Sequence, residues 1–228
     1  MPDNTISKGR SDAGVARKWG AVASFLLAVA FIVAPLIYLM GNLRDAMGVF
    51  AYDLADFLYG PTLAASLVTV TYVLRERIGE RASRRMDLAL LAAALAAGGM
   101  AAVAFIRASN RHYHLMHPEL NLENSSTVLI VWTTLVAGVS ALGFHFLGWT
   151  FLLVGSAGWT TGLFPRVLSI LYLLAGTLSL FVYLFPDSEG GVLLLGLIVS
   201  IWQGILLWKA EPGETQALEI NASQPHQV

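Results

Sequence analysis

The sequence contains no cysteine and has few charged residues. Because none of its 228 residues is a cysteine, disulfide bonds, thiolate catalysis, cysteine-ligated zinc and iron–sulfur clusters are all excluded. Charged residues make up 13% of the chain, against about 25% in average soluble domains. The net charge of −1 carries no information about partners, because the charges are segregated along the chain, and we expect no nucleic-acid partner. The chain also lacks a phosphate-binding loop, a nucleophile elbow and a GxGxxG motif, so nothing in it indicates nucleotide chemistry.

Hydrophobic residues, in contrast, make up 56% of the chain, and they gather in long runs. A helix needs about 20 apolar residues to cross the ~30 Å hydrocarbon core of a bilayer. Six runs are long enough, at about residues 21–40, 50–74, 88–106, 128–155, 167–185 and 192–208. We therefore predict an all-α integral membrane protein in which six transmembrane helices form one bundle over residues 19–209.

Polar tails flank the predicted bundle at residues 1–18 and 210–228. We expect the first tail to be disordered. The run at 21–40 is longer than the ~7–15 apolar residues of a signal peptide, so we expect it to be an uncleaved anchor.

The predicted helices contain residues that distort or tighten helix packing. Proline removes a helical hydrogen bond, so Pro35 and the Gly60-Pro61 pair predict kinks. Small side chains let helix backbones approach closely in a membrane, so the run of Ala and Gly at 91–99 predicts close packing.

The basic residues predict the orientation, because cytoplasmic segments of membrane proteins carry an excess of Lys and Arg. With both termini in the cytoplasm, that side receives Lys8, Arg10, Arg17, Lys18, Arg75, Arg77, Arg81, Arg84, Arg85, Arg166 and Lys209. The outer side receives only Arg44, Arg107 and Arg111. We therefore predict that both termini are cytoplasmic. The basic connector at 75–85 would touch anionic lipid headgroups.

Two carboxylates open the second run. Asp53 and Asp56 are three residues apart, which places them on one face of a helix. Ionisable groups in a membrane are candidate functional groups because burying their charge is costly. Both carboxylates lie close to the outer boundary, where they could reach water or lipid headgroups or pair with Arg44. We interpret them as interfacial groups, with an ion or proton site, mainly at Asp56, as the alternative.

His145 lies deep in the fourth run, and a buried imidazole needs hydrogen-bond partners. By helix rise, Tyr172 and Gln203 should lie at a similar distance from the inner boundary. We therefore predict that His145, Tyr172 and Gln203 form an interhelical polar layer, serving either as a structural hydrogen bond or as a ligand site. The predicted spans contain no second histidine, so we do not expect haem.

The outer connector holds His112, His114 and His117, with Glu119 and Glu123 nearby. Imidazoles and carboxylates are ligands for zinc or copper. The spacing matches no known metal motif, however. We predict a solvated loop, with a metal site as the alternative, and no other cofactor.

Residues 141–185 resemble a known family. The segments that carry the resemblance are Gly-Phe-His-Phe-Leu-Gly at 143–148, Gly-Leu-Phe-Pro-Arg-Val-Leu at 162–168, and Ala175-Gly176. They are similar to an uncharacterised family of bacterial multi-pass membrane proteins known as a domain of unknown function (four-three-eight-six). Ser169 stands where members of that family usually have a glycine.

The resemblance implies a bacterial six-helix membrane fold, with His145 and Pro165-Arg166 as recurring positions. It implies no activity, because none is assigned to that family. We therefore expect a protein of the bacterial inner membrane.

The leading hypothesis for function is a non-enzymatic membrane protein. It would bind a small apolar or amphipathic ligand at His145, Tyr172 and Gln203, or serve as an accessory subunit of another membrane protein. The first alternative is a metal-dependent or redox enzyme that uses the outer histidines with Asp53 and Asp56. The second is a proton-coupled transporter that depends on Asp56.

Overall fold

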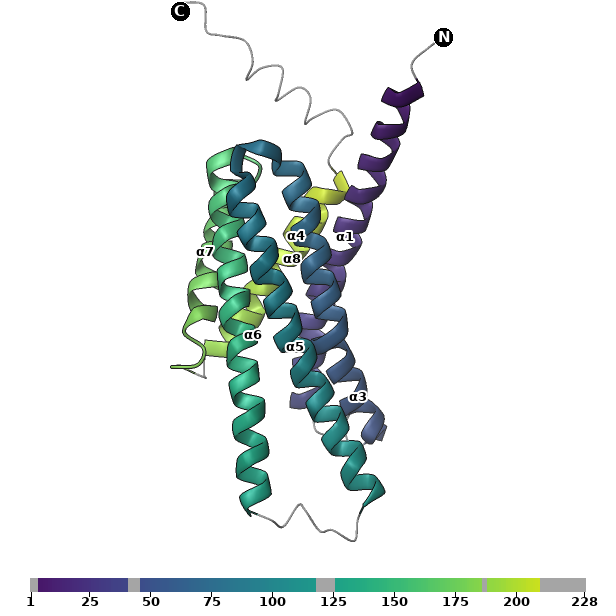
Figure 1. Ribbon diagram of the computed structural model, residues 1–228, viewed down its shortest axis with the longest axis vertical. Coiled ribbons are helices and arrows are strands. Elements are labelled where there is room, and N and C mark those ends of the chain that lie inside the picture. The colour runs from purple at the N-terminus through teal and green to yellow at the C-terminus, as the bar shows by residue number, and fades with distance from the viewer. Residues whose placement is uncertain (1–3, 41–45, 118–125, 186–187, 210–228) are drawn as a thin grey trace, which may run out of the picture.

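The computed structural model describes residues 4–40, 46–117, 126–185 and 188–209. Within these ranges the chain forms helices and no β-strand. The elements are α1 (Asn4–Leu39), α3 (Val49–Phe57), the π-helical η1 (Leu58–Thr62), α4 (Leu63–Ile78), the 3₁₀-helical η2 (Gly79–Ala82), α5 (Ser83–Met116), α6 (Ser126–Thr161), α7 (Arg166–Leu180) and α8 (Glu189–Lys209). Figure 1 shows them as one elongated bundle, which confirms the predicted all-α class.

Four helical segments are long and apolar enough to cross a membrane, judged by length and composition. They are Gly14–Ile37, Val49–Met116, Thr127–Thr161 and Glu189–Lys209. The second segment has 68 residues because helical structure continues through a reversal of the chain at Gly79. There α4 and α5 turn into a hairpin, as Figure 1 shows. Helix α7 is apolar but has only 15 residues. The chain therefore has the apolar helices of a membrane protein.

Glycines in the left-handed region make two of the chain reversals. Gly79 has φ 59° between α4 and α5, and Gly162 has φ 70° between α6 and α7. A side chain would be strained at these angles, whereas glycine adopts them readily. Pro165 then immediately precedes α7. The reversals bring Arg85 of α5 within 3.2 Å of the Thr160 hydroxyl of α6.

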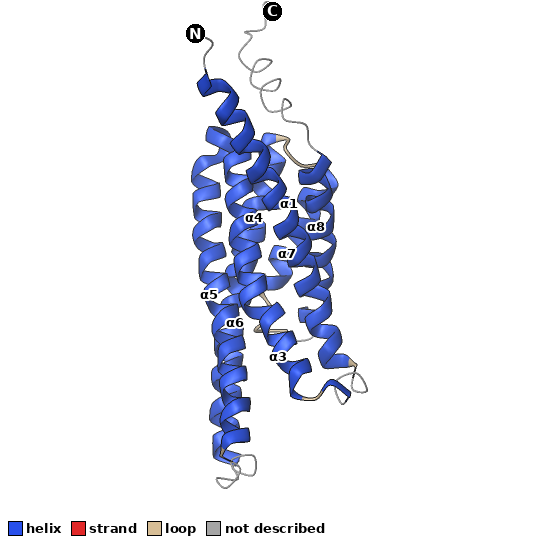
Figure 2. Cartoon of the chain, turned by 90° about the vertical axis from the view of Figure 1, so that its right-hand side faces the viewer, coloured by secondary structure: helices blue, strands red, loops and turns tan. Residues whose placement is uncertain are grey.

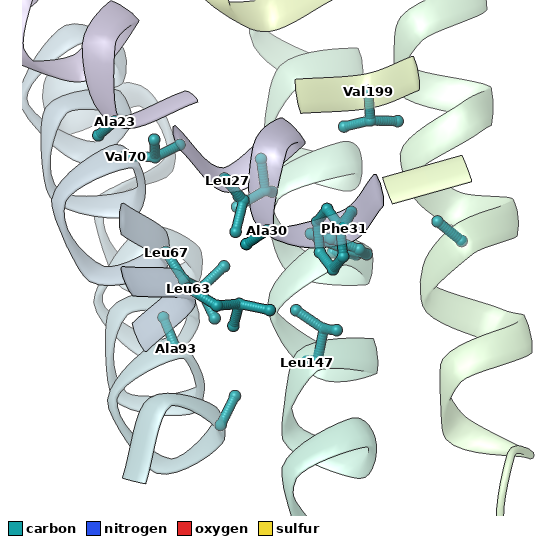
Figure 3. Packing of buried hydrophobic residues seen from close by; sticks show 14 of the residues in the cluster. Ala23, Leu27, Ala30, Phe31, Leu63, Leu67, Val70, Ala93, Leu147 and Val199 are labelled. Atoms are coloured by element: carbon teal, nitrogen blue, oxygen red, sulfur yellow. The ribbon is translucent and has the colours of Figure 1, made fainter. Parts of the chain in front are cut away.

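Apolar residues from several helices form the core. Figure 3 shows Phe31 of α1, Leu63 and Leu67 of α4, and Leu147 of α6 at the centre of the bundle. Each of these side chains is at most 2% exposed. Together they join the helices at the centre of the bundle.

Small residues set the closest helix contacts. Gly148 of α6 and Gly176 of α7 face each other, and a Cβ on either would lie 2.8 Å from the carbonyl oxygen of the other. In the run at 91–99, a Cβ on Gly99 would lie 2.9 Å from the Cα of Gly143. The predicted close packing of that run is therefore confirmed, since α5 and α6 meet there almost backbone to backbone.

Several helices extend beyond the predicted apolar runs. Helix α1 begins at Asn4, so residues 4–18 are not a disordered tail. Once a helix has formed, each further residue extends it without a new nucleation cost. Helix α5 continues to Met116 instead of ending near 106, and α6 continues to Thr161 instead of ending near 155. Polar residues thus extend these helices beyond their apolar centres.

The two predicted kinks have different outcomes. Pro61 lies in the π-helical turn η1, where the regular α-helical hydrogen-bond pattern is interrupted. Pro35 lies inside α1, and that helix continues past it to Leu39.

We call the end of the bundle at which α5 ends and α6 begins the distal end. Here α5 and α6 extend beyond the other helices, as Figures 1 and 2 show from two directions. Ser179, near the end of α7, donates a hydrogen bond of 2.7 Å to the carbonyl of Phe144. Helix α6 has about 18 residues on the distal side of Phe144, which at ~1.5 Å per residue extend ~27 Å. An ion triad and a pocket, described below, lie at this end.

Candidate functional site

An ion triad joins α3 to the distal part of α5. Arg111 of α5 donates from Nη2 to Asp53 Oδ1 at 2.6 Å and to Asp56 Oδ2 at 2.7 Å. Its Nε donates a second bond to Asp53 Oδ1 at 3.1 Å. The Asp56 side chain is 4% exposed, that of Arg111 18% and that of Asp53 34%. The two carboxylates therefore lie on one helical face, as predicted, and they share a single guanidinium group.

Two further side chains border the triad. The guanidinium carbon of Arg111 lies 5.3 Å from the centre of the Tyr52 ring, a cation–π distance. His112 Nε2 lies 3.3 Å from Asp53 Oδ2 and adds a positive charge only when it is protonated. Without that proton, two carboxylates and one guanidinium give the triad a net charge of −1.

The segment that carries the carboxylates lies between two irregular points. Gly48, with φ 58°, precedes α3, and the π-helical turn η1 follows it. Gly60 in η1 packs so closely on α5 that a Cβ would lie 2.3 Å from that of Ala104. Helix α3 itself buries mainly the small residues Ala51 and Ala55. Few of its large apolar side chains are buried, and the triad adds a polar connection between α3 and α5.

A second polar contact lies one turn along α5, toward the centre of the bundle. Glu189, the first residue of α8, lies within reach of the positive charge of Arg107 and of the Tyr59 hydroxyl. Arg107 and Arg111 are four residues apart and share a face of α5. The two arginines therefore place two positive charges on this face of α5, near the carboxylates of Asp53, Asp56 and Glu189.

A pocket of about 380 Å³ opens between the distal parts of α5 and α6. Its lining residues are Asn110, Arg111, His114 and Leu115 of α5 and Val128, Leu129 and Trp132 of α6. Helix α5 thus contributes Asn110, Arg111 and His114, and α6 contributes a mainly apolar wall whose polar group is the indole N–H of Trp132. Arg111 belongs both to the pocket and to the triad.

The outer histidines do not converge. His112 and His114 lie within α5, and His117 directly follows it. At ~100° per residue, helical spacing points these three side chains in different directions. His112 faces Asp53, His114 lines the pocket, and the ring of His117 lies 4.6 Å from that of Tyr113. The predicted solvated loop is therefore wrong for residues 112–116, because the helix continues to Met116.

No group of three or more His, Cys, Asp or Glu side chains that could hold a metal ion occurs in the part of the chain that the structure describes. Three side chains named in the sequence analysis, Arg44, Glu119 and Glu123, lie outside the described residues.

The structure does not bring His145, Tyr172 and Gln203 together. Trp149 donates a hydrogen bond of 3.2 Å to His145 Nε2 from one turn farther along α6. Tyr172 is 3% exposed and stacks on Phe164, with ring centres 5.6 Å apart. Gln203 is 1% exposed and donates a hydrogen bond of 3.3 Å to the Ser24 hydroxyl. The predicted polar layer therefore does not form.

The length of α6 explains this difference. A Cβ on Gly155 of α6 would lie 2.8 Å from the Cβ of Tyr172, so Tyr172 lies at the level of Gly155. His145 is ten residues away along the same helix, or about 15 Å. The prediction measured depth from an inner boundary at Gly155, but α6 continues to Thr161.

Sequence reasoning identified Asp53 and Asp56 but not their partner. Arg111 was placed in a connector, and Asn110 and Trp132 were not considered as site residues. One signal was present, because Arg107 and Arg111 are spaced by four residues, as on a helix that continues beyond the apolar run.

Comparison with known proteins gives no relative: no family model, no curated protein and no solved structure matches this chain.

Proposed function

We propose that this chain is a six-span protein of the bacterial inner membrane with both termini in the cytoplasm. In the segment Val49–Met116, each of the two arms that meet at Gly79 exceeds the ~20 residues that a crossing needs. Helix α7 continues in hydrogen-bonded turns to Phe185, which lengthens its apolar segment. The described basic residues near the α4–α5 turn, Arg75, Arg77, Arg81, Arg84 and Arg85, lie opposite the distal end. Such an excess of positive charge favours a cytoplasmic location for that end.

We further propose that the protein binds a small amphipathic ligand in the distal pocket and catalyses no reaction. The observation that carries this proposal is the division of the pocket into a polar and an apolar wall. Asn110, Arg111 and His114 lie on one helix, and Val128, Leu129 and Trp132 on the other. Ligand pockets commonly combine an apolar lining with a few polar groups that orient the ligand, and volumes of about 300–1,000 Å³ suit a small molecule.

The depth of the pocket agrees with an amphipathic ligand. The apolar part of α5 begins at Leu88, and 20 residues from there reach Arg107, where a bilayer core of ~30 Å would end. Arg111 lies one turn, or about 6 Å, farther out. This is the level of lipid headgroups, where molecules with a polar head and an apolar tail concentrate.

The alternatives have weaker support from the geometry. A metal-dependent enzyme needs converging ligands, and helical spacing directs the three histidines apart. A proton-coupled transporter would need Asp56 to exchange protons, but three charge-assisted hydrogen bonds hold Arg111 between Asp56 and Asp53. An accessory role beside another membrane protein is compatible with ligand binding and makes no separate prediction.

A matched pair of substitutions tests the pocket. Leu129 lines it, whereas the neighbouring Ile130 is 65% exposed and does not. Leu129→Trp should fill the pocket, and Ile130→Trp should not. The amphiphiles that remain bound through purification would be identified by mass spectrometry and quantified per protein chain. We expect at least a tenfold loss in Leu129→Trp and none in Ile130→Trp. Equal retention in both variants, or a native protein without any bound amphiphile, would contradict the proposal.

A further inference from the structure

We infer that the head of the ligand is uncharged and accepts hydrogen bonds, which makes the ligand a neutral single-chain amphiphile such as an alcohol, an ester or a monoglyceride. This inference rests on the proposed function, since it names the chemical class that the distal pocket would select.

Arg111 and Asn110 offer hydrogen-bond donors to the head of the ligand. The hydrogen bonds of Arg111 to other described residues use Nε and Nη2, which leaves the two N–H bonds of Nη1 for another acceptor. The side-chain amide of Asn110 lies in the same wall and makes no hydrogen bond to a described residue. It has two N–H donors and one carbonyl acceptor. An oxygen-bearing head placed between Arg111 and Asn110 would therefore find several donors.

The charges around Arg111 bear on the charge of the head. Arg111 alone would favour an anionic head, but its charge is more than balanced by Asp53 and Asp56, both in direct contact with it. An anion beside Arg111 would thus also meet the repulsion of Asp53 and Asp56, which lie behind the guanidinium. A cation would meet the guanidinium itself at the pocket wall. Partial burial weakens solvent screening of these charges, so a neutral head is favoured over both.

The apolar side chains of the pocket bear on the tail of the ligand. The opposite wall of the pocket consists of Val128, Leu129 and Trp132, and Leu115 adds an apolar side chain from α5. Leu129 is 55% exposed, so this wall continues onto the outer surface of α6. An acyl or alkyl chain can follow that surface, which extends the apolar contact beyond the pocket. One chain suffices to fill a volume of about 380 Å³.

The absence of cysteine makes a direct test simple. A single cysteine in place of Leu129, labelled with an environment-sensitive fluorophore, reports on the pocket, and Ile130→Cys is the matched control. Three amphiphiles with the same C12 chain would be titrated into the purified full chain: monolaurin, ionised dodecanoate and dodecyltrimethylammonium. We expect monolaurin to change the fluorescence of the Leu129→Cys protein at about tenfold lower concentration than either ion, with no such difference in the control.

The outcomes separate the two proposals. Equal or tighter binding of either ion would overturn the neutral head but leave the pocket as a ligand site. If none of the three amphiphiles gives a response specific to position 129, both proposals fail. Asp53→Asn supplies a second test, because it changes the net charge of the triad from −1 to zero. In that variant the preference for monolaurin over dodecanoate should shrink severalfold, and an unchanged preference would contradict the charge argument.

The same neutral head could belong to a membrane lipid or to a solute that arrives from water. Monolaurin supplied only within preformed vesicles and monolaurin supplied only in solution would distinguish these sources by which of them saturates the labelled protein faster. Faster saturation from vesicles would identify a bilayer lipid, and faster saturation from water a solute. Saturation from neither source would overturn the neutral class.

Discussion

Replacing Arg111 by glutamine removes the one positive charge that two carboxylates share. The Asp56 side chain is 4% exposed, so water cannot replace the lost partner there. Asp53, at 34% exposed, can regain part of its hydration. The substitution therefore takes from the buried Asp56 carboxylate the cation that lies 2.7 Å away and breaks the ionic contact between α3 and α5.

The magnitude follows from comparable cases. Breaking a buried ion pair by removing one partner costs about 3–5 kcal/mol. Because the triad is partly hydrated, we expect Arg111→Gln to lower the free energy of unfolding by about 2–4 kcal/mol. Adding Asp56→Asn removes the negative charge that has lost Arg111, so the double variant should recover about half of that loss.

The assay is reversible denaturation of the purified protein in mixed micelles, with helix content followed by circular dichroism. The control is Arg75→Gln at the opposite end of the bundle. Arg75 pairs with Asp87 where both side chains are well exposed, at 38% and 53%, and such pairs contribute at most about 1 kcal/mol. The reasoning is refuted if Arg111→Gln costs no more than Arg75→Gln, or if Asp56→Asn does not restore any of the lost stability.

Three further substitutions test the packing and the site assignment. Gly176→Ala should lower stability by about 1–3 kcal/mol because its Cβ would meet the backbone of Gly148, whereas Gly138→Ala, with no atom within 4 Å of its Cβ, should be neutral in the same denaturation assay. Ser179→Ala should cost about 1 kcal/mol through loss of the hydrogen bond from α7 to α6, and more than Thr177→Ala, whose hydroxyl bonds only within α7. His145→Ala should leave the amount of retained amphiphile unchanged, because His145 accepts a hydrogen bond from Trp149 and lies outside the pocket. Loss of the amphiphile, measured by mass spectrometry, would instead indicate a ligand site at His145.

The pattern of apolar and small residues was sufficient to predict the helical class, the presence of membrane-length apolar helices and the close contact at Gly99. These features depend on local composition, which a single sequence displays directly. It also placed Asp53 and Asp56 on one face, because the helical repeat fixes that relation within a single element.

The predictions that failed are those that depend on how far polar residues extend a helix. Residues of the types found at Asn110, Arg111 and His112 are common in connectors. Nothing in the neighbouring sequence shows that the helix continues to Met116. That extension converts a predicted loop into the wall of a pocket and brings Arg111 to α3. The polar layer failed for the same reason, since six additional residues on α6 shifted His145 away from Tyr172. Contacts between helices require a register that one sequence does not supply.

The most direct test of the proposed ligand site is photo-crosslinking with a neutral C12 amphiphile that carries a diazirine on its chain. After irradiation of the protein in membranes, the labelled peptides would be mapped by mass spectrometry. We predict saturable labelling of residues 110–115 and 128–132, which monolaurin suppresses and Leu129→Trp abolishes. Labelling that does not saturate and spreads evenly over the exposed faces of the helices, or that centres on α7 and α8, would contradict a ligand site between α5 and α6.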